Sequence, residues 1–362
     1  MPDHQPASPT LAAGGGLDIG PPRTGRELNV LLSGQLAERH RFAGSKNPAT
    51  ASRGRHNEGC LRSVPPPRTA GFPVSTHPIP VPGGTLAVET SGSGLPLVLL
   101  HAFPLDHRMW RRVLPLADHV RLIIPDLRGF GESVGPDPAG PRPLSIEQLA
   151  DDVVELLDSL HIAEPAVIAG VSMGGYVAQQ VAVRHPDRVK SLVLIDTKFA
   201  ADTPEARAGR ADLAARVGRV GQRILAEAMI PNLLAASPAA RDRPGRAEVE
   251  NLLHEMITRQ PVATIQAALA ALAERPDMTA AMQQCHLPVL LICGAEDTIT
   301  PPAVMEAMEQ LLPQGRLLVV PETGHLVPLE APAIFCEALL AFLGYRTEPA
   351  GPASGTGGHP AG

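Results

Sequence analysis

Gly170-Val171-Ser172-Met173-Gly174 is a Gly-x-Ser-x-Gly sequence at the point where an apolar run, residues 166–171, gives way to a helix-like segment, residues 176–184. In this context the sequence predicts a nucleophile elbow, a tight strand-to-helix turn that pushes its serine hydroxyl outward for attack. Glycine is needed on both sides of the serine because a side chain there would collide with the strand or the helix. Ser172 is therefore a candidate nucleophile.

Composition and charge narrow the possible classes of function. The chain has 362 residues, 44% of them hydrophobic, which allows one large core or two smaller ones. A formal net charge of −6 argues against a nucleic-acid partner, because surfaces that bind nucleic acid normally carry a basic excess. No run approaches the roughly 18 apolar residues that a membrane-spanning helix needs. The four cysteines lack zinc-site or C-x-x-C spacing, so we expect reduced thiols in a cytoplasmic protein.

Tails with little apolar content are predicted at both ends of the chain. Residues 1–75 are rich in Pro, Gly, Ser and Arg and cannot bury enough apolar surface to offset the entropy of ordering, so we expect disorder. Alternatively, this tail arises from the choice of start site, since no Met occurs between Met1 and Met109. Residues 347–362 are rich in Gly and Pro, and we expect disorder there too.

Between the tails, short apolar runs alternate with amphipathic stretches, which is typical of a mostly parallel sheet covered by helices. The clearest predicted helix spans residues 146–161, where Ser145 and Gln148 form a capping box. Residues 79–81 and 86–89 are predicted to pair as an antiparallel hairpin at the sheet edge. Buried strands are expected at residues 97–100, 121–124, 166–171, 191–195, 289–293 and 317–320.

A long segment without strand-like runs interrupts this alternation. Residues 198–284 are rich in Ala, Leu, Arg and Glu with helical spacing. The segment is too long for an ordinary connection between adjacent strands, so we predict a helical cap or small second domain. Residues 76–197 and 285–346 then form the core. The predicted fold is α/β, with a doubly wound, mostly parallel sheet and a helical cap inserted between two strands.

A serine nucleophile requires an imidazole that takes its proton and a carboxylate that orients the imidazole. The chain supplies both, because Asp297 and His325 each follow directly after a predicted strand. The carboxyl ends of parallel strands meet at one edge of a doubly wound sheet, where ligands bind, so we expect both residues to lie near Ser172. Asp196, which also ends a predicted strand, remains an alternative for the acid.

The motifs around these residues resemble the α/β-hydrolase superfamily, over roughly residues 78–345. Within the superfamily, the segment 101–110 and the helical cap look most like the esterase, non-haem haloperoxidase and 3-oxoadipate enol-lactonase group. The family usually has Gly where Ala102 stands. The matching pieces are His101-Ala102-Phe103-Pro104, Asp126-Leu127-Arg128-Gly129-Phe130-Gly131-Glu132-Ser133, Gly170-Val171-Ser172-Met173-Gly174-Gly175, Gly294-Ala295-Glu296-Asp297 and Gly324-His325.

The resemblance implies Ser172 as the nucleophile, His325 as the base and then acid, and Asp297 as the orienting carboxylate. The backbone N–H groups of Phe103 and Met173 would form the oxyanion hole. It also implies hydrolysis of a small-molecule ester or lactone through an acyl-enzyme, with no metal or organic cofactor. Dehalogenases and epoxide hydrolases of this fold use an Asp nucleophile, so the serine at the elbow argues against both.

Other residues in these motifs are expected to support the site. His101 is predicted to position the oxyanion loop through a backbone hydrogen bond, and it is a candidate for the substrate pocket together with Trp110. His107 and Trp110 are expected to pack against the adjacent helix or to line the pocket wall. Asp126 and Arg128 are expected to form a structural turn.

Functions other than ester hydrolysis remain open. A cofactor-free perhydrolase or haloperoxidase would use the same triad, with peroxide in place of water in deacylation. A non-catalytic protein of this fold would bind its ligand with an idle triad, because fold does not guarantee activity. Substrate identity depends on the pocket shape beneath the cap, and neither the substrate nor the oligomeric state is predicted.

Overall fold

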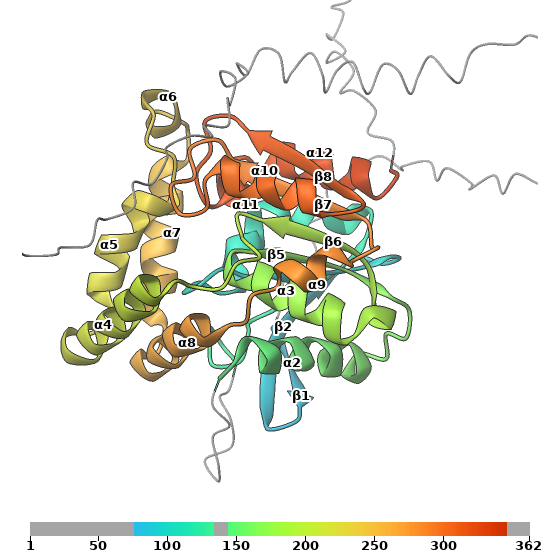
Figure 1. Cartoon of the computed structure of the whole chain (residues 1–362), viewed down its shortest axis with the longest axis horizontal. Coiled ribbons are helices and arrows are strands. Elements are labelled where there is room, and N and C mark those ends of the chain that lie inside the picture. Colours follow the sequence, from blue (N-terminus) through green and yellow to red (C-terminus); the bar gives the residue numbers. More distant parts are fainter. Residues whose placement is uncertain (1–75, 134–143, 346–362) are drawn as a thin grey trace, which may run out of the picture. The chain divides into compact units, whose positions relative to one another are not determined.

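A computed structural model of the chain describes residues 76–133 and 144–345, in which strands form one sheet with helices on both faces (Figure 1). The predicted tails, residues 1–75 and 347–362, and Cys60 lie outside the described residues. The eight strands are ordered β1-β2-β4-β3-β5-β6-β7-β8. They are β1 (Thr76–Val81), β2 (Gly84–Ser91), β3 (Pro96–Leu100), β4 (Arg121–Pro125), β5 (Ala166–Val171), β6 (Val189–Ile195), β7 (Val289–Gly294) and β8 (Gly315–Val320).

The sheet is parallel from β4 to β8, whereas β1 and β2 form an antiparallel hairpin at one edge. Every residue of β3, β5 and β7 is buried. Such continuous apolar runs are expected of parallel strands that are covered on both faces. The predicted fold class, strand positions and edge hairpin are therefore confirmed. The strand predicted at residues 317–320 is not fully buried as expected, because β8 lies at the other edge of the sheet and most of its residues are half-buried.

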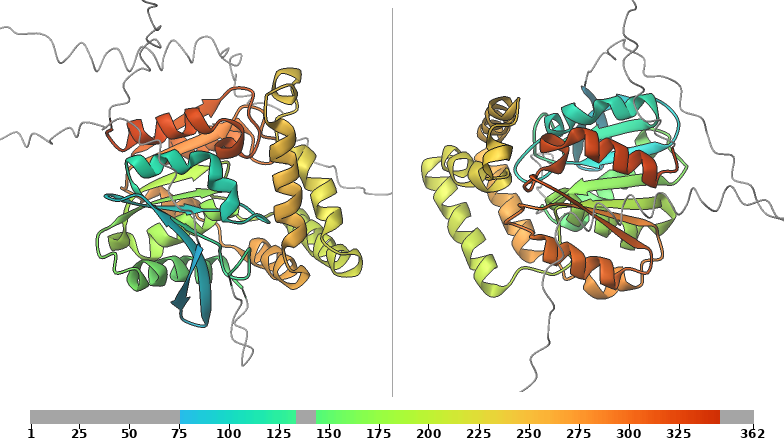
Figure 2. Two further views of the ribbon diagram at one scale, coloured as in Figure 1. Left: turned by 180° about the vertical axis from the view of Figure 1, so that it is seen from behind. Right: turned by 90° about the horizontal axis from the view of Figure 1, so that it is seen from above.

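Helices of the core pack in two layers, one on each face of the sheet (Figure 2). On one face α12 packs against the 3₁₀ helix η1, and on the other α3 packs against α2 and α9. Helix α2 begins at Ile146 as predicted, with the Ser145 side chain accepting from Gln148 N. Only this half of the predicted capping box is found, because the Gln148 side chain donates to Asp152 instead. The core elements are η1 (His107–Asp118), α2 (Ile146–Ser159), α3 (Met173–Arg184), η2 (Pro186–Arg188), α10 (Pro302–Leu311), α11 (Val327–Glu330) and α12 (Pro332–Phe342).

A group of helices, the cap, separates β6 from β7 in the chain, and none of the residues described between these strands forms a further strand. Within it α4 packs on α8 and α5 on α7, beside the sheet (Figures 1 and 2). None of the described helices has both the length and the apolar character needed to cross a membrane. The helices of the cap are α4 (Pro204–Val220), α5 (Arg223–Leu233), α6 (Pro238–Arg241), α7 (Arg246–Arg259) and α8 (Val262–Glu274). The short helix α9 (Thr279–Gln283) follows the cap in the chain and packs against α3 of the core.

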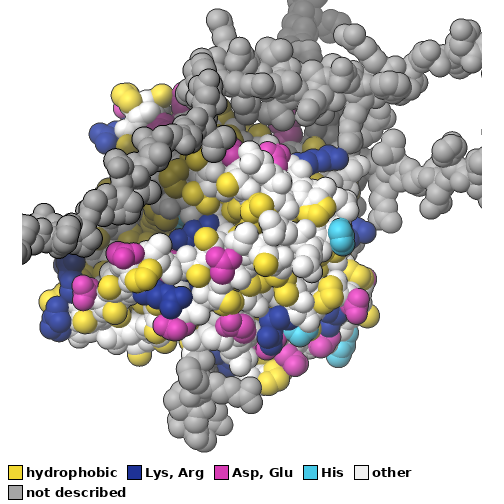
Figure 3. Space-filling model, in the orientation of Figure 1, with side chains coloured by type: hydrophobic (Ala, Val, Ile, Leu, Met, Phe, Trp, Pro, Cys, Tyr) yellow, Lys and Arg dark blue, Asp and Glu magenta, His cyan; other side chains and the backbone are white. Residues whose placement is uncertain are grey.

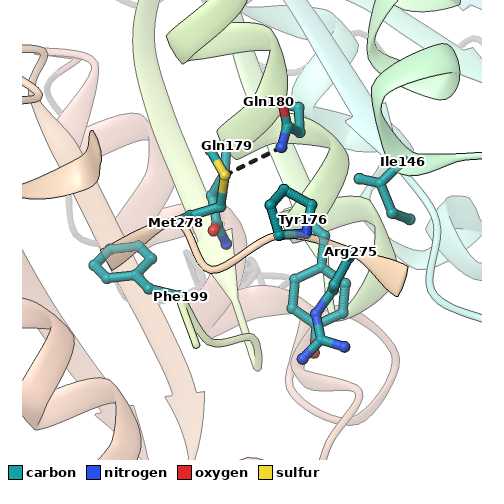
Figure 4. Close-up of a pocket in the computed structure, with 8 residues that line it drawn as sticks. Ile146, Tyr176, Gln179, Gln180, Phe199, Arg275 and Met278 are labelled. Atoms are coloured by element: carbon teal, nitrogen blue, oxygen red, sulfur yellow. Dashed lines mark hydrogen bonds between the residues drawn. The ribbon is translucent and has the colours of Figure 1, made fainter. Parts of the chain in front are cut away.

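The two connections between core and cap are joined to each other at a point that we call the cap hinge, formed by Phe199, Asp202, Arg275 and Met278. Met278 N donates to Phe199 O over 2.9 Å. Arg275 forms a buried ion pair with Asp202, with 2.8 Å between Nη1 and Oδ1. The Arg275 guanidinium also lies over the ring of Tyr176, 4.3 Å from its centroid (Figure 4). Because Tyr176 belongs to α3, the hinge is anchored on the helix that follows Ser172.

The hinge gives a pH-dependent prediction for stability. Burial raises the pKa of Asp202, but hydrogen bonds from Arg210 and Arg275 outweigh it and lower the pKa from 3.8 to about 2. A carboxyl group whose pKa is depressed by folding stabilises the folded state above its unfolded pKa, and this contribution disappears as pH falls through the folded pKa. We expect Asp202→Asn to lower the free energy of unfolding by about 2 kcal/mol at pH 7.

Thermal unfolding of both proteins between pH 7 and pH 2 would check this prediction. The difference in Tm between wild type and Asp202→Asn should hold from pH 7 to about pH 4 and close as pH approaches 2. A difference that stayed constant over this range would show that the carboxylate charge contributes nothing.

Candidate active site

Ser172 lies in a strained turn between β5 and α3. Its φ is 52° and its ψ is −109°, a conformation that residues with a side chain rarely adopt. Ser172 N donates to Ile195 O, and Thr197 Oγ1 donates to Ser172 O, each over 2.9 Å. The surrounding fold thus holds the strained serine from both sides of its backbone.

The two glycines that flank this serine are required by close backbone contacts. A Cβ atom at Gly170 would lie 2.1 Å from Gly174 O, and a Cβ atom at Gly174 would lie 2.2 Å from Leu100 O. Both distances are far shorter than a carbon–oxygen contact allows. The turn therefore has the geometry of the predicted nucleophile elbow.

Asp297 and His325 are brought together from the ends of β7 and β8. His325 Nδ1 lies 2.8 Å from Asp297 Oδ2, and both side chains are buried. The other carboxylate oxygen, Oδ1, accepts from the backbone N–H groups of Ile299 and Thr300. Burial raises the pKa of Asp297, but hydrogen bonds from His325 and Thr300 outweigh it and leave this pKa below its usual value. Asp297 is thus a carboxylate fixed to hold the His325 Nδ1–H.

Asp196, the alternative acid, is arranged differently. Its Oδ1 accepts from Gly294 N over 2.9 Å, while its Oδ2 has no hydrogen-bond partner among the described residues. Complete burial and the nearby charge of Asp297 raise the pKa of Asp196 well above its usual value. These conditions favour an uncharged carboxyl group. The side chain bonded to His325 is that of Asp297, the residue that the sequence analysis preferred.

Ser172 and His325 are not linked by any hydrogen bond found among the described residues, so the structure joins the acid and the imidazole but not the nucleophile. Catalytic hydrogen bonds are often long without substrate and tighten in the complex. The N–H groups predicted for the oxyanion hole belong to Phe103, after β3, and Met173, the first residue of α3. Neither N–H donates to a backbone acceptor in the part of the chain that the structure describes.

The sequence model of the alpha/beta hydrolase fold family matches residues 96–332. The chain belongs to the α/β-hydrolase family. This α/β hydrolase is similar to a pimeloyl-[acyl-carrier protein] methyl ester esterase from Vibrio vulnificus, at 30% identity over 263 residues, which cover 71% of this chain and 97% of that protein. The predicted family and the prediction of an enzyme are confirmed.

Two solved structures resemble this α/β hydrolase closely. One is a thermophilic esterase from Thermogutta terrifontis with malate bound, at 39% identity and a TM-score of 0.69, covering 74% of this chain and 98% of that chain. The other is an enol-lactonase from Burkholderia xenovorans LB400, at 26% identity and a TM-score of 0.67. The match covers 74% of this chain and 99% of that chain.

In this α/β hydrolase, the two residues predicted to line the substrate pocket are completely buried. His101 Nε2 accepts from Leu127 N over 2.9 Å, so its Nδ1 carries the hydrogen and donates to Ala102 O over 3.0 Å. Burial lowers the pKa of His101, which favours this neutral form. Trp110 packs against Phe335, with 6.0 Å between the ring centroids. Both residues have 0% exposure, so neither forms an exposed pocket wall.

The predicted structural turn after β4 is held by buried ionic contacts. Asp126 Oδ1 lies 2.9 Å from His107 Nδ1, and Asp126 Oδ2 accepts from Glu132 N over 2.8 Å. Arg128 makes a two-point contact with Asp152. His107, Asp126 and Arg128 therefore stabilise the fold of the hydrolase core, as the sequence analysis expected for Asp126 and Arg128.

Thr300 is a residue of the site that the sequence analysis missed. Its hydroxyl donates to Asp297 Oδ2 and lies 3.4 Å from His325 Nδ1. The available signal was a hydroxyl three residues after a candidate acid, a spacing that often allows local side-chain bonding in a turn.

Proposed function

We propose that this α/β hydrolase is a serine hydrolase that cleaves a small-molecule carboxylic ester or lactone through an acyl-enzyme intermediate. The observation that carries the proposal is the buried Asp297–His325 pair at the sheet edge that also presents the strained Ser172. With Nδ1–H held by Asp297, the lone pair of His325 Nε2 is free to take the proton of the serine hydroxyl.

The first half of the reaction would transfer the acyl group to the enzyme. Ser172 Oγ attacks the ester carbonyl as its proton passes to His325 Nε2, and the carbonyl oxygen becomes an oxyanion. The N–H groups of Phe103 and Met173 are suited to stabilise this charge because neither donates to the backbone of the described residues. The C–O bond to the alcohol then breaks, and His325 returns the proton to the leaving oxygen.

The second half would release the acid. Water attacks the acyl-enzyme while His325 accepts its proton, and the intermediate collapses with return of the proton to Ser172. Asp297 stays ionised throughout and stabilises the imidazolium, in agreement with its lowered pKa.

The relatives support an ester or lactone as the substrate class, since they are named as a methyl ester esterase, a thermophilic esterase and an enol-lactonase. Hydrophobic side chains gather between the cap and the core on the face shown in Figure 3. Half-buried apolar residues of the cap include Ile224, Met229, Ile230 and Leu252. Under this proposal such apolar residues would accommodate an apolar acyl chain, with the attacked carbonyl placed beside Ser172.

Covalent labelling with a fluorophosphonate tests the proposal. The probe should add one adduct per chain, which peptide mass spectrometry should place on Ser172, and a panel of p-nitrophenyl esters and lactones should be hydrolysed. Folded protein that hydrolyses none of the panel and is not labelled would contradict the proposal. Peroxide-dependent halide oxidation faster than ester hydrolysis would instead favour the perhydrolase function.

A further inference from the structure

A segment of the cap, residues 233–237, is bonded directly to the loop that carries His325. We call it the clasp segment. His325 N donates to Leu233 O over 3.0 Å. Glu330 bridges the two sides: its Oε2 accepts from Ala235 N and its Oε1 accepts from Gly324 N, each over 2.8 Å. The residue before His325 and the clasp segment are thus held by one carboxylate.

The same segment is bonded to the loop that carries Asp297. Ala236 N and Ser237 N both donate to Glu296 Oε2, each over 2.9 Å. Burial raises the pKa of Glu296, but the hydrogen bonds from Ser237 and Ala236 outweigh it and lower the pKa. A carboxylate that accepts two backbone N–H groups makes charge-assisted bonds, which are stronger than neutral ones. The backbone of Glu296 also donates to Thr323 O over 2.8 Å and so joins the two loops directly.

The clasp segment also packs closely against the loop of His325. A Cβ atom at Gly324 would lie 2.6 Å from Ala235 N, so the cap backbone rests directly on the residue before His325. Two arginines of the cap reinforce the contact from outside. Arg243 Nη1 donates to Glu330 O over 2.7 Å, and Arg246 Nη1 donates to Ala235 O over 2.8 Å.

We propose that Glu296 and Glu330 are positioning residues that use the clasp segment to fix the loop of Asp297 against the loop of His325. This proposal rests on the proposed function. The position of the cap then sets the geometry of the Asp297–His325 hydrogen bond, because both loops take their register from the same cap backbone. A misplacement of about 1 Å between catalytic groups can cost about 100-fold in rate.

Glu296→Ala tests the proposal. It removes the acceptor of two N–H groups, whereas the hydrogen bond from Glu296 N to Thr323 O does not depend on the side chain. We expect kcat per fluorophosphonate-titrated site to fall about tenfold or more, with KM changed less than about threefold. Glu296→Gln keeps one oxygen at this position and should restore most of kcat. Glu330→Gln keeps only one of two acceptor oxygens and should give an intermediate kcat.

Glu255→Ala is the matched control, because Glu255 also joins cap to core, through Arg108 at 3.3 Å. Among the described residues, its side chain has no hydrogen bond or ion pair to either catalytic loop. It should leave kcat per site unchanged. Wild-type kcat per site in Glu296→Ala, or an equal loss in Glu255→Ala, would overturn the proposal. So would failure of glutamine to do better than alanine.

A spectroscopic measurement separates this proposal from the proposed function. The proton between His325 Nδ1 and Asp297 should give a downfield NMR signal in the wild type and in Glu296→Gln, and the signal should be shifted or broadened in Glu296→Ala. Absence of labelling and turnover in the wild type would contradict the proposed function alone. An unchanged proton signal in Glu296→Ala would overturn the positioning role, whatever the turnover.

Discussion

Replacement of Ser172 by alanine is expected to lower kcat/KM for an ester about 10⁵-fold and to abolish fluorophosphonate labelling. Without the hydroxyl no acyl-enzyme can form, and only the oxyanion hole and substrate binding remain to favour attack by water. The change removes one oxygen atom from a turn that is held through its backbone, by Ile195 O and the Thr197 hydroxyl, so the fold should be retained.

The kinetic comparison should include Ser159→Ala, because Ser159 lies on α2 and its hydroxyl donates to Pro80 O, away from the catalytic loops. We expect Ser159→Ala to keep wild-type turnover and labelling. If Ser172→Ala retained more than about one hundredth of wild-type kcat/KM, the nucleophile would have to be a different residue.

Asp297→Asn is expected to lower kcat about 10³- to 10⁴-fold. The asparagine amide would present an N–H group to His325 Nδ1 in place of a carboxylate, which favours the wrong tautomer and leaves the developing imidazolium without its counter-charge. The matched control is Asp196→Asn, which we expect to change kcat less than about threefold at neutral pH. In the wild type the pKa of Asp196 is raised well above its usual value, and an asparagine side chain resembles the uncharged carboxyl group that this favours.

The pair of variants decides which acid the enzyme uses. Stopped assays with one p-nitrophenyl ester, normalised by active-site titration, are sufficient. A large loss in Asp196→Asn with near-wild-type turnover in Asp297→Asn would move the orienting role to the carboxyl group that follows β6.

The central strands could be predicted from the sequence because β3, β5 and β7 are short, branched apolar runs that are buried on both faces. The start of α3 was predicted three residues late. Gly174 and Gly175 have a low helix propensity, which hid the first turn of α3 in the sequence. In the structure glycine is needed at both positions, because a Cβ atom would collide with β3 at Gly174 and with Thr197 at Gly175. Helix α2 ends before residue 161 because His161 turns to a φ of 55°.

Within the site, the positions of Ser172, Asp297 and His325 followed from strand ends and chain order. The choice between Asp297 and Asp196 required the path of the loop after β7, where Thr300 fixes the carboxylate of Asp297. Contacts such as those of Glu296 with the clasp segment join residues far apart in the chain through backbone N–H groups. Nearly every residue has a backbone N–H group, so the pattern of side chains in the sequence could not predict which of these groups bind Glu296.

The cap hinge brings the entry and the exit of the cap together in space. Its entry and exit are one hydrogen bond apart, at Phe199 and Met278, so a helical insert of different length could replace this one without moving β6 from β7. Recombination at this point would exchange the cap helices and leave the sheet and the loops at its strand ends in place. A replacement cap would also have to keep the ion pair between Asp202 and Arg275 at its ends. It would further have to provide backbone N–H groups that donate to Glu296 and Glu330.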